Sequence, residues 1–132
     1  MRRLVLASLA VVIVGISGLA LAASVKREGT FSELQASGIS GEVRVHGQAG
    51  KETLVQIQAR NLQPEQEYRI FAYTNTTCGS DPSQVLLATA TPNKQGMLNW
   101  NGKIIRPVEE FGSVSLVLVA DDQAKACAEN LQ

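Results

Sequence analysis

Alternation of apolar and polar residues over positions 39–60 constrains the fold of this chain more than any other feature of its sequence. In the first half of this stretch, every second residue is apolar or small: Ile39, Gly41, Val43 and Val45. In the second half, the alternating set is Thr53, Val55, Ile57 and Ala59. Because successive side chains of a strand point to opposite faces, each set predicts a half-buried β-strand. The turn-forming residues 47–50 between them predict a hairpin.

Further short segments of β-strand character follow at residues 68–73, 85–91, 97–101, 103–105 and 113–120. Pro64 breaks the pattern before the first of them, because proline donates no backbone hydrogen bond. Within residues 68–73 each face carries an aromatic side chain, so either face could supply the core. We interpret Trp100 as a core residue rather than a platform for a ligand. Many short strands, with no long helix after residue 22, predict an all-β, antiparallel sandwich or barrel.

The N-terminus has the three regions of a secretory signal peptide. Arg2 and Arg3 supply the basic start, and an apolar run from Leu4 to Ala22 ends in small residues that precede a cleavage position. Residues 1–22 are therefore predicted to form a signal-peptide helix, and cleavage is favoured over retention as an anchor. We expect export to the periplasm, the cell surface or the extracellular space, with membrane contact only through an uncleaved leader.

Residues 23–38 form a lead-in whose structure the sequence leaves open. Thr30 and Glu33 have the spacing of a capping box and Gly38 can stop a helix, so one short helical turn fits this segment. A first strand or an extended tether fits it equally well. The remaining residues, 39–132, are expected to form a single domain around one core.

Cys78 and Cys127 are the two cysteines of the chain. An exported protein enters an oxidising compartment, so a disulfide between them is the expected state. Closing the long loop between them stabilises the fold by about 4 kcal/mol in the chain-entropy model. A redox function would be better supported by a Cys-x-x-Cys pair, so we interpret this pair as structural.

The charge pattern argues against nucleic acid as a partner. Twelve basic residues balance twelve acidic ones, and beyond Arg2-Arg3 in the leader and the pair Lys26-Arg27 the basic residues are scattered singly. A surface that follows a phosphate backbone needs clustered lysine and arginine side chains. We therefore expect these charges to form an ordinary solvated surface.

The residue types offer little for catalysis or cofactor binding. His46 is the one histidine, whereas copper and zinc sites need several imidazole or thiolate ligands. The adjacent acids Glu109-Glu110 and Asp121-Asp122 are expected to be solvated, because neighbouring side chains of an extended chain point to opposite faces. We expect no catalytic residues, no metal ligands and no cofactor.

Several short motifs are spread over residues 39–130. They are the glycine-bearing stretch Gly41–Val45, the turn Leu62-Gln63-Pro64, the strand leading to Cys78, the sequence LATATPNKQG at 87–96, the valine-rich stretch Val114–Asp122 and the terminal Lys125-Ala126-Cys127. Together these motifs resemble the Cu/Zn superoxide dismutase family. That family joins the same two regions by a disulfide, so the resemblance supports the Cys78–Cys127 pair. It implies an antiparallel Greek-key, immunoglobulin-like sandwich over residues 39–132.

The same resemblance implies no dismutase activity. The paired copper-binding histidines of the family would fall near Phe71 and Tyr73, and no histidine follows Cys78. The zinc ligands of the family lack counterparts too, because the segment at 79–84 is short. The turn at 62–65 also lacks the glycine that the family has there.

Two function hypotheses follow. The favoured one is a non-catalytic exported module, binding or structural in the cell envelope or outside the cell, with an unknown protein or envelope partner. Such a module would bind through a sheet face, an exposed edge or the loop at 74–83, whose candidate interaction residues are Asn75, Thr76, Thr77 and Asp81. The alternative is a divergent metal-binding or redox protein of the same fold, with a site assembled from Tyr73, His46 and nearby acids.

Overall fold

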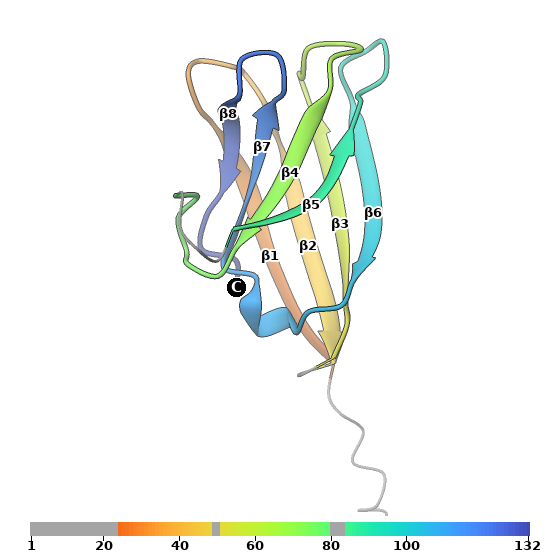
Figure 1. Ribbon diagram of the computed structural model, residues 1–132, viewed down its shortest axis with the longest axis vertical. Helices are drawn as coiled ribbons and strands as arrows, with labels where there is room; N and C mark the ends of the chain where they lie inside the picture. The colour runs from red at the N-terminus through yellow and green to blue at the C-terminus, as the bar shows by residue number, and fades with distance from the viewer. Residues whose placement is uncertain (1–23, 49–50, 80–83) are drawn as a thin grey trace, which may run out of the picture.

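Antiparallel strands make up most of the computed structural model, which describes residues 24–48, 51–79 and 84–132 (Figure 1). The strands are β1 (Ser24–Glu33), β2 (Ser40–Gln48), β3 (Thr53–Arg60), β4 (Tyr68–Tyr73), β5 (Val85–Ala90), β6 (Leu98–Ile104), β7 (Ser113–Leu118) and β8 (Gln123–Ala128), and the short 3-10 helix η2 spans Val108–Glu110. The predicted signal-peptide helix at 1–22 lies outside the described residues. The all-β, antiparallel class predicted from the alternation is confirmed.

The eight strands form one sheet in the order β5-β4-β7-β8-β1-β2-β3-β6. Strand β1 links its two halves, because residues 24–30 pair with β2 whereas residues 31–33 pair with β8. The sheet curls until its two end strands, β5 and β6, approach each other, which gives a nearly closed, barrel-like shape (Figure 1). One face of each strand therefore lines a common interior.

The core fills this interior with the residues that the alternation places on one face of β2 and β3. Val43, Val45, Val55 and Ile57 are at most 1% exposed, as the pattern predicts. Burying one such aliphatic side chain stabilises the fold by about 1.5–3 kcal/mol. The register of the hairpin keeps the set together, because Val43 lies opposite Ile57 and Val45 opposite Val55.

On β4 the sequence leaves both faces open, and the structure selects one of them. Tyr68, Ile70 and Ala72 belong to the core, whereas Phe71 is half-buried. Tyr73 is buried without belonging to the core cluster, and its hydroxyl lies 2.9 Å from that of Ser115 on β7. The aromatic at the start of the strand therefore supplies the core.

The lead-in segment forms a strand, one of the three structures that its sequence allows. Thr30 and Glu33 both lie within β1 and do not begin a helix. Gln35 and Ala36, which have positive φ angles of 56° and 52°, turn the chain after the strand. Pairing with β2 on one side and β8 on the other holds residues 24–33 extended, so the long-range contacts outweigh the local capping signal.

Strand β6 runs without interruption where the sequence predicts two segments, at 97–101 and 103–105. Gly102 lies between them and carries no side chain, and the indole of Trp100 occupies the space that a methyl group there would fill. Trp100 is half-buried against the core, in agreement with its interpretation as a core residue. Packing of the indole over Gly102 therefore allows this strand to continue through a glycine.

The core is least covered at the seam, as we call the junction between β5 and β6. These end strands are not neighbours in the hydrogen-bonded order of the sheet. Most of the half-buried apolar residues that pack against the core belong to them: Leu87, Ala88, Ala90, Trp100 and Ile104. The seam is thus the place where the interior comes closest to solvent.

Candidate functional site

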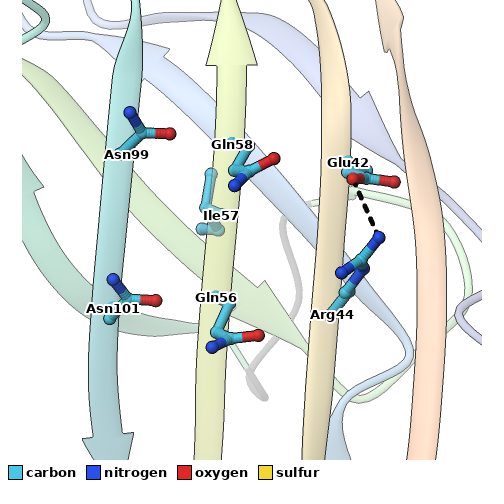
Figure 2. Close-up of a pocket in the computed structure, with 7 residues that line it drawn as sticks. All are labelled: Glu42, Arg44, Gln56, Ile57, Gln58, Asn99 and Asn101. Carbon is cyan, nitrogen blue, oxygen red and sulfur yellow. Dashed lines mark hydrogen bonds and ion pairs between the residues drawn. The ribbon is translucent and has the colours of Figure 1, made fainter.

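The outer side of β2, β3 and β6 carries a shallow depression of about 320 Å³. Two rows of polar side chains cross it, each with one residue from each strand. In the first row Gln56 lies between Arg44 and Asn101, and in the second row Gln58 lies between Glu42 and Asn99. Figure 2 shows these six side chains on the same side of the sheet. We call this surface the amide face.

Four carboxamides dominate the amide face: Gln56, Gln58, Asn99 and Asn101. Within the part of the chain that the structure describes, none of these side chains forms a hydrogen bond, and the single dashed line in Figure 2 joins Glu42 to Arg44. Each carboxamide has two N–H donors and one carbonyl acceptor. The amide face therefore offers a dense group of donors and acceptors that no other described residue uses.

The charges on the amide face compensate each other. The Arg44 guanidinium lies 3.2 Å from the Glu42 carboxylate and 3.9 Å from that of Glu28. The carboxamides themselves do not ionise in the range where proteins are folded. The surface can bind by hydrogen bonding, but its amides cannot act as general acids or bases.

The alternation at 53–60 predicts that Gln56 and Gln58 lie on the polar face of a strand, but it indicates no function for them. The signal that could have found the site is a repeated pattern, since Gln56-Ile57-Gln58 and Asn99-Trp100-Asn101 both place an apolar residue between two amides. Each pattern buries or half-buries its middle residue and turns both amides outward. That the two strands are neighbours is a property of the fold, because β3 and β6 are far apart in the sequence.

The predicted disulfide is confirmed: Cys78 is bonded to Cys127, with their Cα atoms 6.0 Å apart. It fastens the segment after β4 to strand β8. Two hydrogen bonds position the same segment, one from the Ser113 hydroxyl to the Asn75 carbonyl at 3.0 Å and one from the Asn130 N–H to the Thr76 carbonyl at 2.9 Å. The first part of the candidate interaction loop is thus held against the sheet.

The candidate loop residues differ in accessibility. Thr76 and Thr77 are exposed, whereas Asn75 is half-buried where the loop meets the sheet. Asp81 lies outside the described residues. The loop can therefore present two threonine side chains to a partner, and they belong to a different part of the sheet from the amide face.

Tyr73 and His46, the residues of the alternative metal or redox site, are not brought together. Tyr73 is buried on β4 beside Ser115. His46 lies on β2, next to Leu54 and Lys103 in a second depression. In the order of the sheet, β7, β8 and β1 separate these two strands.

The adjacent acids interact with different basic residues. Glu110, on η2 rather than in extended chain, lies 3.4 Å from Arg106. Asp122 lies 3.1 Å from Arg69.

Asp121 accepts a hydrogen bond from the Lys125 ammonium at 2.7 Å, and this bond lowers the pKa of its carboxyl below the usual range. Across residues 24–48, 51–79 and 84–132, no three His, Cys, Asp or Glu side chains gather in a way that could hold a metal ion. The same residues contain no helix with the length and hydrophobicity needed to cross a membrane.

Comparison with known proteins adds no assignment, because no protein-family model and no curated protein matches the chain.

Proposed function

We propose that the chain is an exported, non-catalytic binding module whose amide face takes a neutral, polyhydroxylated ligand, a glycan chain. The observation that carries this proposal is the group of four carboxamides, on two neighbouring strands, without a hydrogen-bond partner in the described part of the chain. The proposed export rests on the leader pattern at residues 1–22, and the disulfide is consistent with an oxidising compartment.

The fold proposed for this module is a Greek-key sandwich similar to that of the Cu/Zn superoxide dismutases. The connections β3–β4, β5–β6 and β6–β7 join strands that are not neighbours in the sheet, and crossing connections of this kind characterise Greek-key topologies. The disulfide between the segment after β4 and strand β8 adds support, because the sequence resemblance implies a bond between those regions. On this proposal the chain keeps the framework of that family without its metal site.

The chemistry of the amide face favours a neutral ligand that both donates and accepts hydrogen bonds. A sugar hydroxyl does both, as does a carboxamide. A charged ligand would gain little, since the Glu42 and Arg44 charges already compensate each other. With a few hydrogen bonds, each worth about 0.5–1.5 kcal/mol, and no aromatic residue on this face, we expect dissociation constants on the order of 1 mM for a short glycan.

A titration followed by nuclear magnetic resonance tests the proposal. Neutral oligosaccharides are added to the chain that begins at Ala23, and the side-chain NH₂ signals of glutamine and asparagine are observed. The signals of Gln56 and Asn101 should shift and reach a plateau as the oligosaccharide concentration rises. In the double variant Gln56→Ala/Asn101→Ala, the remaining amide signals should show no such saturable shift. The matched control is Gln66→Ala/Gln123→Ala, which removes two exposed amides elsewhere and should leave binding unchanged.

Three results would contradict this assignment. The first is the absence of movement at the amide face with every neutral oligosaccharide, and the second is equal loss of binding in the control variant. The third is stoichiometric copper or zinc in the purified protein, measured by elemental mass spectrometry, because it would favour the metal-binding alternative. We expect the folded chain to purify without either metal.

A further inference from the structure

The amide face continues toward both ends of β3. At one end it adjoins a depression of about 370 Å³, which is lined by His46, Leu54 and Lys103. At the other end it adjoins a depression of about 510 Å³, which Arg60 and Met97 line together with two side chains of the amide face itself. We call these three depressions together the extended amide face.

The register between β2, β3 and β6 arranges the extended amide face in successive rows. Leu54 lies between His46 and Lys103, as the glutamines of β3 lie between their neighbours in the next two rows. The last row holds Arg60, and the residues that β3 contributes from one end to the other are Leu54, Gln56, Gln58 and Arg60. Residues two apart on a strand are separated by about 7 Å, so the four rows extend over about 20 Å.

Side chains of one kind repeat along the strands and not across them. Figure 2 shows Gln58 above Gln56 on β3, and Asn99 above Asn101 on β6. Across the strands, each of these two rows instead changes from a charged side chain on β2 to amides on β3 and β6. A ligand built of repeating units therefore meets the same groups again only when its chain runs parallel to β3 and β6.

Ion pairs along β1 and β2 form one border of this path. The Glu28 carboxylate lies 3.1 Å from the Lys26 ammonium and 3.9 Å from the Arg44 guanidinium. The same guanidinium lies 3.2 Å from the Glu42 carboxylate. Because these charged groups interact with one another, the amides of β3 and β6 are the groups that remain to bind a neutral chain.

The two ends of the extended amide face add apolar contacts to the hydrogen-bonding groups. Leu54 is half-buried at one end, and Met97 is 47% exposed at the other. A sugar ring carries apolar C–H groups as well as hydroxyls, so it can pack against such side chains while its hydroxyls bond to amides. Beside Met97, the Arg60 guanidinium supplies five N–H donors that suit hydroxyl oxygens.

We propose that the extended amide face binds a linear glycan chain that lies parallel to β3 and β6 and spans about 20 Å. This inference rests on the function proposed for the amide face, and it adds the orientation and the minimum length of the ligand. A short glycan contacts the amides alone. A chain that spans the four rows also contacts Leu54 and Met97, so the affinity depends on chain length.

Nuclear magnetic resonance can follow the two ends separately, because His46 is the one histidine and Met97 the one methionine of residues 23–132. The chain that begins at Ala23 contains every strand of the described sheet. The probes are the disaccharides and hexasaccharides of cellulose, chitin and starch. A disaccharide that binds should shift the amide signals alone, whereas its hexasaccharide should also shift the His46 ring and Met97 methyl signals. The hexasaccharide should bind about tenfold more tightly, since one or two further contacts of ordinary strength give that factor.

Met97→Ala should weaken hexasaccharide binding several-fold and leave disaccharide binding unchanged. The matched control is Leu86→Ala, because Leu86 is 52% exposed and lies opposite Phe71 on β4, away from the extended amide face. This control should affect neither ligand.

Two results would overturn this inference and leave the function proposed for the amide face in place. They are equal affinity for disaccharides and hexasaccharides that shift the amide signals, and a bound hexasaccharide that leaves the His46 and Met97 signals unmoved. Equal losses of hexasaccharide binding in Met97→Ala and Leu86→Ala would also contradict it. The absence of any shift at the amides with all of these oligosaccharides would overturn both the inference and the proposed function.

Discussion

The Tyr68 hydroxyl accepts a hydrogen bond from the backbone N–H of Gln63 at 2.9 Å. Tyr68 begins β4 and is 1% exposed, and Gln63 lies in the connection that leaves β3. The bond therefore fixes the path of a connection between two strands that are not neighbours in the sheet. It also gives a buried hydroxyl a partner at the edge of the core.

Tyr68→Phe keeps the ring and removes this bond. The hydrogen bond is partly buried, and a typical intramolecular hydrogen bond contributes about 0.5–1.5 kcal/mol, so we expect the free energy of unfolding to fall by that amount. Urea unfolding followed by circular dichroism measures the change. The control is Gln63→Ala, which keeps the backbone N–H and changes an exposed side chain, and it should cost less than about 0.5 kcal/mol. Equal effects of the two substitutions would mean that the hydrogen bond is not the source of the stability.

Removing the disulfide should be the most destabilising of the changes considered. Cys78 and Cys127 are 49 residues apart, and the double variant Cys78→Ser/Cys127→Ser should lose about 2–5 kcal/mol of unfolding free energy. The measurement is urea unfolding of the oxidised wild type, the reduced wild type and the variant. The reduced wild type should behave like the variant, and an unchanged midpoint on reduction would contradict the prediction.

Gly112 should not tolerate a side chain. A methyl group at this position would collide with the carbonyl oxygens of Thr74 and Asn75, where the loop lies directly on the start of β7. Gly112→Ala should therefore cost about 1–3 kcal/mol and increase hydrogen exchange at the Asn130 N–H, which bonds the same loop. Gly79→Ala is the matched control, because nothing lies within 4 Å of the position of its new methyl group. A similar loss of unfolding free energy in both variants would indicate a general effect of replacing glycine with alanine, rather than a collision with the loop.

The hydrogen bond between Asp121 and Lys125 should make stability depend on pH. The bond lowers the pKa of Asp121 from its reference value of 3.8, so its contribution is fully present above that value. The contribution disappears as the pH falls through the lowered, folded-state pKa. Asp121→Asn should thus be less stable than the wild type near neutral pH, and the difference should vanish in strong acid.

Urea unfolding over a series of pH values measures this difference. In a Lys125→Gln background, Asp121→Asn should have a smaller effect, because the largest cause of the lowered pKa is absent and the backbone N–H of Gln123 still bonds the carboxylate. A difference between wild type and Asp121→Asn that persists undiminished in strong acid would show that the ionised carboxylate is not its cause.

The strands with clear alternation could be predicted from the sequence. On β2 and β3 the apolar set is regular, and the structure buries Val43, Val45, Val55 and Ile57 as expected. These strands form a hairpin, so each strand pairs with its neighbour in the sequence, and the local pattern is enough to predict the pairing. The disulfide was also predictable, since the chain has two cysteines, which allow a single internal pair, and its leader pattern predicts an oxidising compartment.

Strand β8 could not be predicted in the same way. Its sequence, Gln123–Ala128, is rich in alanine and lacks the branched and aromatic residues that favour strands. It is extended because it pairs with β7 on one side and with the end of β1 on the other. The sequence of its partner β1 fits three local structures for the same reason, since long-range pairing and not local preference holds that segment extended.

The amide face was partly visible in the sequence. The outward direction of Gln56 and Gln58 follows from the alternation, but their proximity to Asn99 and Asn101 depends on β6 crossing the molecule to lie beside β3. No rule based on local sequence identifies that neighbour.

The fluorescence of Trp100 can report on the seam between β5 and β6. Trp100, on β6, is the one tryptophan of the chain and is half-buried against the core. Its fluorescence should shift to longer wavelength whenever the seam admits water. A change in emission without a change in circular dichroism would therefore report local parting of the end strands while the remainder of the sheet stays folded.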